Sequence, residues 1–568
     1  MSACTKTDWF LLGGIVLIAA LVLVATNNDY GLTYDEPVYA SRAATLVQHW
    51  LGLLVQRPAT ALSRASIDRY WQAKGEEHPS LMKLTVALTS ALCAAALPGL
   101  GSLRAAANLY FCVALVFVYL YARRLAGRAA GAFAALALLT MPRLFAHGHL
   151  VALDVPVTAL TLATLYLIWR ALERGTWTSA IAAGLVFGLA LETKLAAIII
   201  LPVFLIVCAL QLIGARGGPS TRGPVAPWTR VLVCLVLISP LVFVLLWPWL
   251  WYDSLPRLAE YLRFHLRHYP VTTYYFGRTY AYAPWHYPLV YTLITIPPVT
   301  LALAFIGALG YTKCRGVPMN RDAPTPVVTS ELSQRLGLSL LFVTLALFYL
   351  GTMLPKTPKY NGERLILPVF PLWAVLAGLG FDLIRRWLIR RFAHTSFVGA
   401  VRQRPLLITS LLAALALVGP ARAVAVTHPY QLSYYNILIG NLRGASKVGM
   451  EPTYWGDTYL AGWSWLTQNA PPNAKIWIAQ QGMLSIFELY RGASERRDLV
   501  LTYSEIPARD VDYAVLQNKP SEFNAGCQAL LKSGASPDYT LQLGGVPLLY
   551  VFDRAGLMAA RQAAPAGK

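Results

Sequence analysis

Residues 9–40 read "WFLLGGIVLIAALVLVATNNDYGLTYDEPVYA", and two features of this stretch indicate the fold. Residues 9–26 carry no charge and are long enough to cross a membrane as one helix. The segment is too long for a signal peptide and lacks a clear cleavage site, so it indicates a signal anchor. A few residues later Asp35 and Glu36 stand side by side before Pro37. Adjacent carboxylates repel each other near a membrane, so their position needs an explanation.

The rest of the chain repeats the apolar pattern. Of 568 residues, 56% are apolar and 13% are charged, about half the charged share of a soluble domain. The apolar runs predict membrane spans at 9–26, 105–122, 129–146, 154–172, 178–192, 195–214, 231–249, 287–311, 336–354, 364–384 and 405–424. One more apolar stretch, 81–98, either crosses the membrane or lies in its outer interface. The predicted fold class is a polytopic α-helical membrane protein with about 11 spans plus interfacial helices.

The arginines favour the interfacial alternative for 81–98. With eleven spans, every predicted cytoplasmic segment carries Lys or Arg, such as the cluster Arg123, Arg124 and Arg128. The net charge of +21 is then mainly a topology signal, and we expect the lipid bilayer as a partner and no nucleic acid. The same topology places 27–104 and 250–286 outside, and the pattern of 37–55 predicts a helix in the interface.

The tail after residue 424 differs in kind. Its long apolar runs stop, and predicted helices at 457–469, 484–491 and 521–533 alternate with short strands such as "KIWIA" and "DYAVLQ". We therefore predict two domains, a membrane-embedded one at 1–424 and a small extracytoplasmic α/β domain at 425–568.

Ionisable residues avoid the middles of the predicted spans and gather at their outer ends. They are Asp35, Glu36, Glu77, His78, Arg104, Arg143, Asp154, Glu192, Lys194, Lys356, Lys359, Glu363 and Arg364. Charge at membrane depth is costly, so such groups usually face a cavity or a partner. A secondary transporter would place its polar site near the bilayer midplane. The pattern instead favours a site that opens to the outer face.

Three motifs each allow two interpretations. Thr33-x-x-Glu36 matches a helix capping box, which is compatible with Asp35 pointing into a cavity. His147, His149 and Asp154 could bind a metal ion or could be polar residues at a span boundary. The external cations of "LPKTPKYNGERLILPVFP" (354–371) suit an anionic ligand or an ordinary loop. The seven cysteines show no disulfide or zinc pattern.

Five stretches together resemble a known family. They are "TYDEPVYA", "EEHPSLMKL", "LRAAANLYF", "HLVALDVPVTALTLATLYL" and "PKYNGERLILPVFP". Their order over residues 1–425 resembles the GT-C glycosyltransferases of the protein O-mannosyltransferase and lipid A aminoarabinose transferase type, family 39-like. The resemblance implies that Asp35 is the catalytic base, that Glu77 lines the same cavity and that the donor is a polyprenyl-phosphate sugar. The family has a Glu-His/Lys-Pro-Pro turn, and in this chain Ser80 stands where that turn has its second proline. The β-trefoil insertion of the eukaryotic protein mannosyltransferases is also absent, which leaves the acceptor open.

The predicted function is transfer of a sugar from a polyprenyl-phosphate carrier to an acceptor hydroxyl or phosphate of a protein or glycolipid. Transfer would be inverting, at the outer face of the bacterial inner membrane. The predicted catalytic residues are Asp35, Glu36 and Glu77, although Glu36 could instead cap or support. The predicted substrate-binding residues are His78, Arg104, Asp154, Lys194, Arg278, Lys359, Tyr360 and Arg364. The sequence gives no certain cofactor, and a divalent metal ion stays open. The alternatives are a lipid-linked glycan flippase or transporter, and an O-antigen-type ligase or polymerase.

Overall fold

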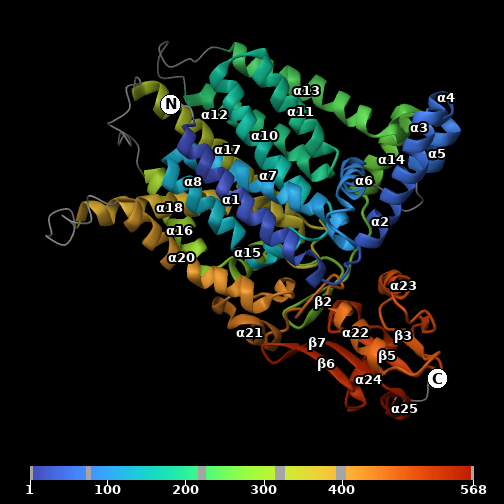
Figure 1. Ribbon diagram of the computed structural model, residues 1–568. Helices are drawn as coiled ribbons and strands as arrows, with labels where there is room; N and C mark the ends of the chain where they lie inside the picture. The colour runs from blue at the N-terminus through green and yellow to red at the C-terminus, as the bar shows by residue number, and fades with distance from the viewer. Residues whose placement is uncertain (1–3, 72–77, 215–224, 314–326, 392–404, 564–568) are drawn as a thin grey trace.

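The structure is a computed structural model, and it describes residues 4–71, 78–214, 225–313, 327–391 and 405–563. Most of these residues form helices, which pack side by side above a small sheet near the C-terminus (Figure 1). The predicted fold class, a polytopic helical protein with an α/β part at the end, is confirmed. The predicted catalytic residue Glu77 lies outside the described residues.

Eight helices in the described ranges are long and apolar enough to cross a membrane. They are α1 (Lys6–Thr26), α7 (Leu100–Ala126), α10 (Asp154–Arg174), the 3-10 helix η3 (Leu195–Ile199) continued by α12 (Ile200–Gly214), α13 (Ala226–Leu246), α17 (Val327–Met353), α18 (Phe370–Arg391) and α20 (Pro405–Thr427). A ninth span is formed if α15 (Tyr287–Thr295) and α16 (Pro298–Lys313) count together, although they are bent by 114°.

Each of the eleven predicted spans coincides with a helical region, but two of them, 129–146 and 287–311, are broken into two helices. Predicted span 129–146 divides into α8 (Arg128–Leu139) and α9 (Pro142–His147), because Pro142 begins a new helix. Predicted span 287–311 divides into α15 and α16 at the 114° bend. Predicted span 178–192 is α11 (Trp177–Leu191), which has the predicted length of 15 residues. Stretch 81–98 contains α6 (Leu81–Cys93), which at 13 residues is about 20 Å long and cannot cross the apolar core alone.

Close helix packing forms the core of the membrane part. A Cβ at Gly307 of α16 would overlap the carbonyl of Leu376, and one at Gly380 of α18 would overlap the carbonyl of Leu303. Glycine at these two positions lets the backbones approach, which is a common way to join helices in a membrane.

Short helices form a second layer beside one end of the bundle (Figure 1). They are α2 (Glu36–Thr45), the π-helical η2 (Leu46–Leu51), α3 (Gly52–Gln56), α4 (Pro58–Ala61), α5 (Arg64–Trp71) and α14 (Ser254–Leu266). Arg257 of α14 donates to Asp68 of α5 at 2.5 Å, and the Trp50 and Trp71 rings pack edge to face. The predicted helix over 37–55 is therefore present as three consecutive helices.

The C-terminal part is an α/β structure. Its elements are α21 (Asn441–Lys447), α22 (Tyr459–Asn469), β3 (Lys475–Ile478), α23 (Leu484–Ala493), β4 (Val500–Thr502), β5 (Tyr513–Gln517), α24 (Ala525–Lys532), β6 (Tyr539–Leu543), β7 (Val546–Phe552) and α25 (Arg554–Ala563). The strands form one sheet in the order β4-β3-β5-β7-β6, in which β3 runs parallel to β4 and β5 while β7 is antiparallel to β5 and β6. A separate hairpin joins β1 (Thr273–Tyr275) to β2 (Arg278–Tyr280).

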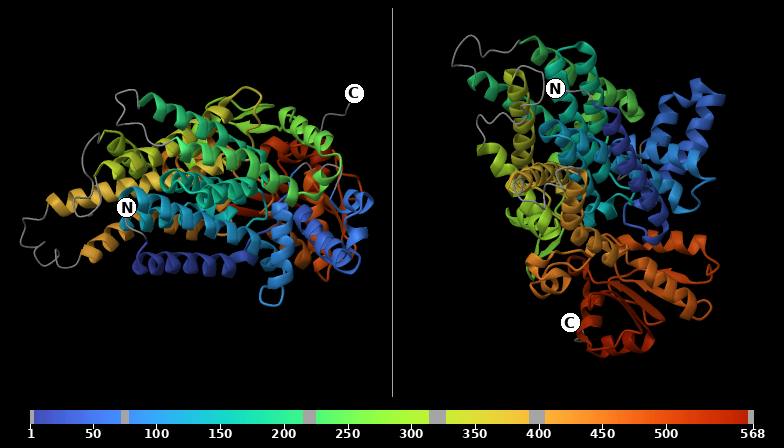
Figure 2. Two further views of the ribbon diagram at one scale, coloured as in Figure 1. Left: turned by 90° about the horizontal axis from the view of Figure 1, so that it is seen from above. Right: turned by 60° about the vertical axis from the view of Figure 1, so that its left-hand side comes forward.

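The two ends of the bundle carry different charged groups. Asp8, near the start of α1, accepts hydrogen bonds from Arg123 and Arg128, both at 2.7 Å. This basic end lies away from the α/β part, whereas α1 ends beside the α/β part (Figures 1 and 2). The arrangement agrees with the separation of basic and mixed-charge loops that the sequence indicates.

Candidate functional site

Four predicted site residues meet in one charged cluster. Arg364 donates from Nε to Asp154 Oδ2 at 2.7 Å and from Nη2 to Asp35 Oδ2. Lys194 donates from Nζ to the other oxygen of Asp154, Oδ1, at 2.9 Å. Two carboxylates and two cations therefore alternate, so each carboxylate has an opposite charge beside it.

Four chain segments bring this cluster together. Asp35 precedes α2, Asp154 is the first residue of α10, Lys194 precedes the 3-10 helix η3 (Leu195–Ile199), and Arg364 begins the 3-10 helix η7 (Arg364–Val369). All four lie at helix starts, where side chains can leave the apolar helix and meet polar groups.

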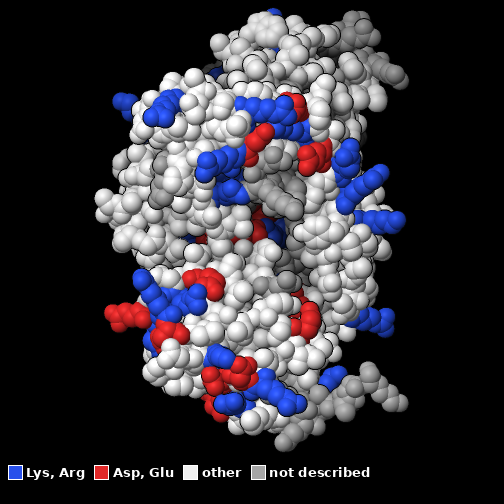
Figure 3. All heavy atoms as spheres, turned by 90° about the vertical axis from the view of Figure 1, so that its right-hand side faces the viewer, with Lys and Arg blue, Asp and Glu red and all other residues white. Residues whose placement is uncertain are grey.

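Asp35 is the more exposed of the two carboxylates in the cluster. Its side chain is 21% exposed, whereas that of Asp154 is 2% exposed. Among the described residues, no donor bonds Oδ1 of Asp35. Figure 3 shows this face hollowed between the helical part and the α/β part, with acidic and basic side chains inside the hollow. Asp35 thus has one carboxylate oxygen, Oδ1, without a donor in the described part of the chain.

Glu36 and Arg104 form a buried clamp behind Asp35. Arg104 donates to both oxygens of Glu36 at 2.8 Å, and its remaining hydrogens reach the carbonyls of Asn27, Tyr30 and Gly31. Arg104 is completely buried, and Glu36 is nearly so. The backbone N–H of Thr33 also donates to Glu36, at 2.9 Å, which is one of the two bonds of the predicted capping box, although α2 begins after Asp35 without a side-chain cap. The clamp therefore fixes the loop that carries Asp35, and its guanidinium has no hydrogen left for a substrate.

The α/β part contributes residues that the sequence reasoning missed. The Trp455 ring lies under Arg364, with 4.1 Å between the guanidinium carbon and the ring centroid. Tyr454 donates to Glu363 at 2.9 Å, and Glu363 accepts from Arg143 at 2.6 Å. Nothing in their segment, "EPTYWGDT" (451–458), signals these contacts, because their partners lie about 90 residues or more away in the chain.

His78 lies close to the cluster in a cationic environment. Burial lowers the pKa of His78 well below its usual value, and the charges of Lys194, Lys83 and Arg364 lower that pKa further. Its Nδ1 is buried without a hydrogen-bond partner in the described ranges, as is Nε2 of His265, and the two rings are 5.7 Å apart. Two unpaired ring nitrogens beside Lys194 can therefore serve as hydrogen-bonding groups for a polar ligand.

The next motif residue, Ser80, has a structural contact. Its Oγ donates to Glu192 at 3.0 Å, and it also donates to the carbonyl of Leu246. The serine that replaces a proline of the family motif thus joins α6 to α11 and α13.

The remaining predicted binding residues differ in their placement. Burial raises the pKa of Tyr360, on which the charges of Arg364, Asp154 and Asp35 also act, so Tyr360 lies close to the cluster. Lys359 donates to the carbonyls of Leu354 and Thr357 at 3.1 and 3.0 Å, which turns it toward its own loop.

Arg278 is exposed in β2, and the described structure shows no contact between it and the cluster. It is not brought together with the other predicted binding residues.

The histidine pair faces two different directions. His147 Nε2 lies 3.1 Å from the hydroxyl of Tyr454, and His149 Nε2 lies 2.8 Å from the hydroxyl of Thr26. Within the described residues, no group of three or more His, Cys, Asp or Glu side chains could hold a metal ion. His147 and His149 therefore do not form a metal site with other described residues.

Comparisons with known proteins agree with the architecture. Residues 77–247 match the family model described as dolichyl-phosphate-mannose-protein mannosyltransferase. The crystal structure of ArnT from Cupriavidus metallidurans in the apo state is similar, with a TM-score of 0.50, 16% identity and coverage of 97% of this chain and 99% of that chain. A structure of ArnT from the same organism bound to undecaprenyl phosphate gives a TM-score of 0.49 at 18% identity, covering 96% of this chain and 98% of that chain. A search of curated proteins gave no match.

A third similar structure is archaeal. It is the oligosaccharyltransferase AglB from Archaeoglobus fulgidus in complex with an inhibitory peptide and a dolichol-phosphate, with a TM-score of 0.45 and 12% identity, covering 90% of this chain and 70% of that chain. The chain has the GT-C fold, and the resemblance to the GT-C glycosyltransferases is confirmed. These findings support a glycosyltransferase of GT-C type that is an integral membrane protein.

Proposed function

We propose that the chain transfers a sugar from a polyprenyl monophosphate carrier to an acceptor hydroxyl or phosphate, with inversion and with Asp35 as the base. The observation that carries this proposal is the cluster in which Arg364 holds Asp35 beside the buried, lysine-paired Asp154. The description of the family model that matches residues 77–247 names dolichyl-phosphate-mannose as the donor, and ArnT has been solved with undecaprenyl phosphate bound. A lipid-borne phosphate sugar is the donor that agrees with both.

The cluster divides the chemistry between a base and a set of cations. The acceptor O–H donates to Asp35, which takes the proton as the acceptor oxygen bonds to the anomeric carbon. The bond from that carbon to the phosphate oxygen breaks, and the polyprenyl phosphate leaves with the electron pair. Lys194 still has two unused N–H donors, and with His78 it can hold the departing phosphate. A single displacement of this kind needs one base.

The supporting residues have structural roles in this proposal. Glu36 and Arg104 fix the loop of Asp35, and Trp455 fixes the plane of Arg364. Lys359 and Arg278 would not touch the phosphate, while Tyr360 lies close enough to contact the sugar or the acceptor. Glu77, which precedes His78 in the chain, remains a proposed lining residue.

The site lies at the end of the bundle that meets the α/β part. We propose that this end is extracytoplasmic, that the membrane is the bacterial inner membrane, and that residues 1–424 and 425–568 form the membrane and extracytoplasmic domains. A carrier tail could stay in the bilayer while its phosphate enters from the side. A protein or a glycolipid could supply the acceptor group from outside.

A donor comparison tests this proposal. Purified protein is mixed with membranes from a strain that lacks the chain, which supply the acceptor, and with undecaprenyl monophosphate sugars or with UDP-, GDP- or CMP-sugars. We expect transfer from a lipid-linked sugar alone. Lys194→Gln should lower this transfer by about 10²–10³-fold, because the leaving phosphate loses a charged donor. Lys356→Gln is the matched control, since Lys356 is exposed in the loop before Arg364. Transfer from a nucleotide sugar with none from the lipid-linked form would overturn the proposal.

A further inference from the structure

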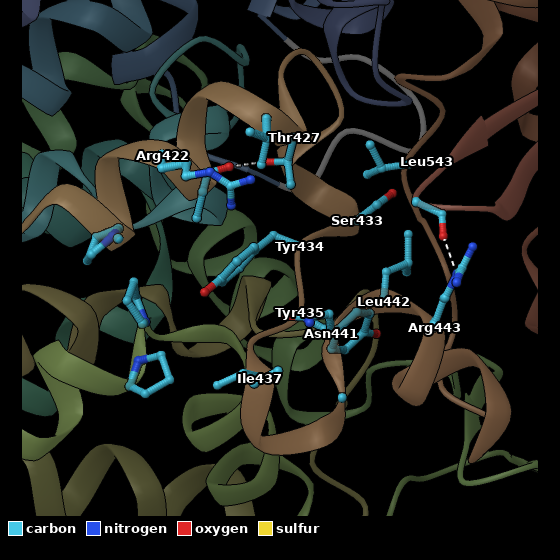
Figure 4. Close-up of a pocket in the computed structure, with 18 of the residues that line it drawn as sticks. Arg422, Thr427, Ser433, Tyr434, Tyr435, Ile437, Asn441, Leu442, Arg443 and Leu543 are labelled. Carbon is cyan, nitrogen blue, oxygen red and sulfur yellow. Dashed lines mark hydrogen bonds between the residues drawn. The ribbon is translucent and has the colours of Figure 1, made fainter.

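A second pocket lies away from the charged cluster. It has a volume of about 830 Å³, within the usual range of about 300–1,000 Å³ for small-molecule sites. Its wall is formed by the break between α15 and α16, by the last turns of α20 and by residues 433–443 (Figure 4). α20 is an apolar candidate span and α16 belongs to the bent pair that together could form one, so the pocket lies at the ends of two apolar helices.

The pocket has an apolar side that continues onto a lipid-facing helix. Only 11% of the apolar window of α20 is buried within the protein, and Val418 and Val426 on this helix are 62% and 54% exposed. Ile437, which lines the pocket, is 65% exposed, and its neighbour Leu438 is 63% exposed. A surface of this kind at a helix end suits acyl chains rather than water.

The pocket also has a cationic side. Arg422 lies one to two turns before the end of α20, is exposed, and has no carboxylate partner among the described residues. Arg443 on the opposite wall donates to the carbonyl of Gly544 at 2.6 Å and likewise has no carboxylate partner in the described part of the chain. Figure 4 shows Arg422 and Arg443 on two sides of the pocket. An arginine on a lipid-facing helix is costly unless its guanidinium reaches the headgroup level and finds an anion.

A buried polar atom completes the pocket. Ser433 is fully buried, and its Oγ has no hydrogen-bond partner among the described residues, although the residue lines the pocket. A buried hydroxyl without a partner is unfavourable, and an acceptor atom of a ligand in the pocket would satisfy it.

We infer that this pocket binds the phosphate headgroup of one anionic phospholipid, with the acyl chains along α20 and α16. Arg422 and Arg443 donate to the phosphate oxygens, and the Ser433 hydroxyl donates a further hydrogen bond. The inference does not depend on the proposed transfer reaction. On the far side of the pocket wall, Tyr434 accepts from Arg143 at 2.7 Å through its carbonyl, so the lipid would steady the wall that holds the Arg143–Glu363 pair.

Lipid binding by the full-length protein tests this inference. Protein in neutral detergent is titrated with phosphatidylglycerol or phosphatidylcholine, and bound lipid is counted by native mass spectrometry together with the thermal midpoint. We expect one retained phosphatidylglycerol that raises the midpoint. Arg422→Gln and Arg443→Gln together should weaken its binding by about 10–100-fold, because two charged hydrogen bonds are lost. Arg422→Lys should recover part of the affinity, since it keeps the charge without the guanidinium fork.

Three controls make the outcome decisive. Arg497→Gln removes an exposed arginine of the α/β part and should leave lipid binding unchanged. Arg422→Gln alone is the variant least able to disturb folding, because the described structure gives Arg422 no hydrogen bond to lose. Inorganic phosphate and glycerol phosphate should not compete at millimolar concentration. Equal retention of phosphatidylcholine, unchanged binding in the double variant, or competition by inorganic phosphate would each overturn the assignment of a lipid.

Discussion

Glu36→Gln should destabilise the protein strongly while its neighbour Asp35 should tolerate a similar change. The Glu36 carboxylate accepts two hydrogen bonds from Arg104 at 2.8 Å, one from the N–H of residue 33 at 2.9 Å and one from the N–H of residue 151 at 3.3 Å. Glutamine keeps the size of the side chain but removes the charge and turns one acceptor into an NH₂ group that faces donors.

The magnitude follows from burial. The Arg104 and Glu36 side chains are 0% and 4% exposed, so solvent cannot screen the charge that would be left on Arg104. Breaking a buried pair by removing one partner costs about 3–5 kcal/mol. An exposed pair is worth about 0–1 kcal/mol, and Glu331 with Arg335, at 44% and 62% exposure, offers that comparison.

The measurement is the thermal midpoint of Glu36→Gln and of the control Glu331→Gln in the same detergent, with the folded fraction from gel filtration. We expect a clear drop in the midpoint for Glu36→Gln and almost none for the control. Transfer per folded molecule should fall less for Glu36→Gln than for a change at Asp35. Wild-type stability combined with lost transfer would refute the clamp and would make Glu36 part of the chemistry.

Three other outcomes follow from the structure. In a cysteine-free background, an impermeant maleimide should label Ser536→Cys but not Thr178→Cys in spheroplasts, and the reverse result would contradict the proposed sidedness. Trp455→Ala should lower transfer about tenfold by freeing the stacked arginine, while Trp285→Ala, at an exposed ring, should not. Burial raises the pKa of Asp457 to about 7, so the folded state keeps a proton that the unfolded chain loses above about pH 4, and stability falls between pH 4 and 7. Asp457→Asn should therefore raise the thermal midpoint more at pH 8 than at pH 5, and an equal shift at both pH values would count against this buried acid.

Sequence periodicity predicted the helices well because lipid-facing apolar runs leave a clear signal. It did not show that two spans are broken, at Pro142 between α8 and α9 and at the 114° bend between α15 and α16. The strands of the C-terminal part were also predictable from their short β-branched and aromatic runs between turns.

The cluster was predictable in part. Asp35, Asp154, Lys194 and Arg364 were found because charge at span ends is rare and costly. Their pairing could not be read from the sequence, because the residues lie up to 329 positions apart. Trp455 was missed for the same reason, since a tryptophan in a soluble segment carries no signal that it stacks on a membrane-end arginine.

For Arg104 and Lys359 the sequence suggested a binding role that their contacts do not support. Each looked like a free cation for phosphate, yet Glu36 and three backbone carbonyls take all the N–H groups of Arg104, and two carbonyls of its own loop accept from Lys359. A sequence shows that a cation is present but not whether its hydrogens are already used.

The role of Asp35 is the central claim, and one kinetic comparison tests it most directly. Release of polyprenyl phosphate from a lipid-linked sugar donor is followed for the wild type and for Asp35→Asn, with acceptor membranes in excess. The substitution keeps the size of the side chain and removes the base, so the rate should fall by about 10²–10⁴-fold while the thermal midpoint stays close to that of the wild type. A rate for Asp35→Asn near that of the wild type would contradict the assignment of Asp35 as the base.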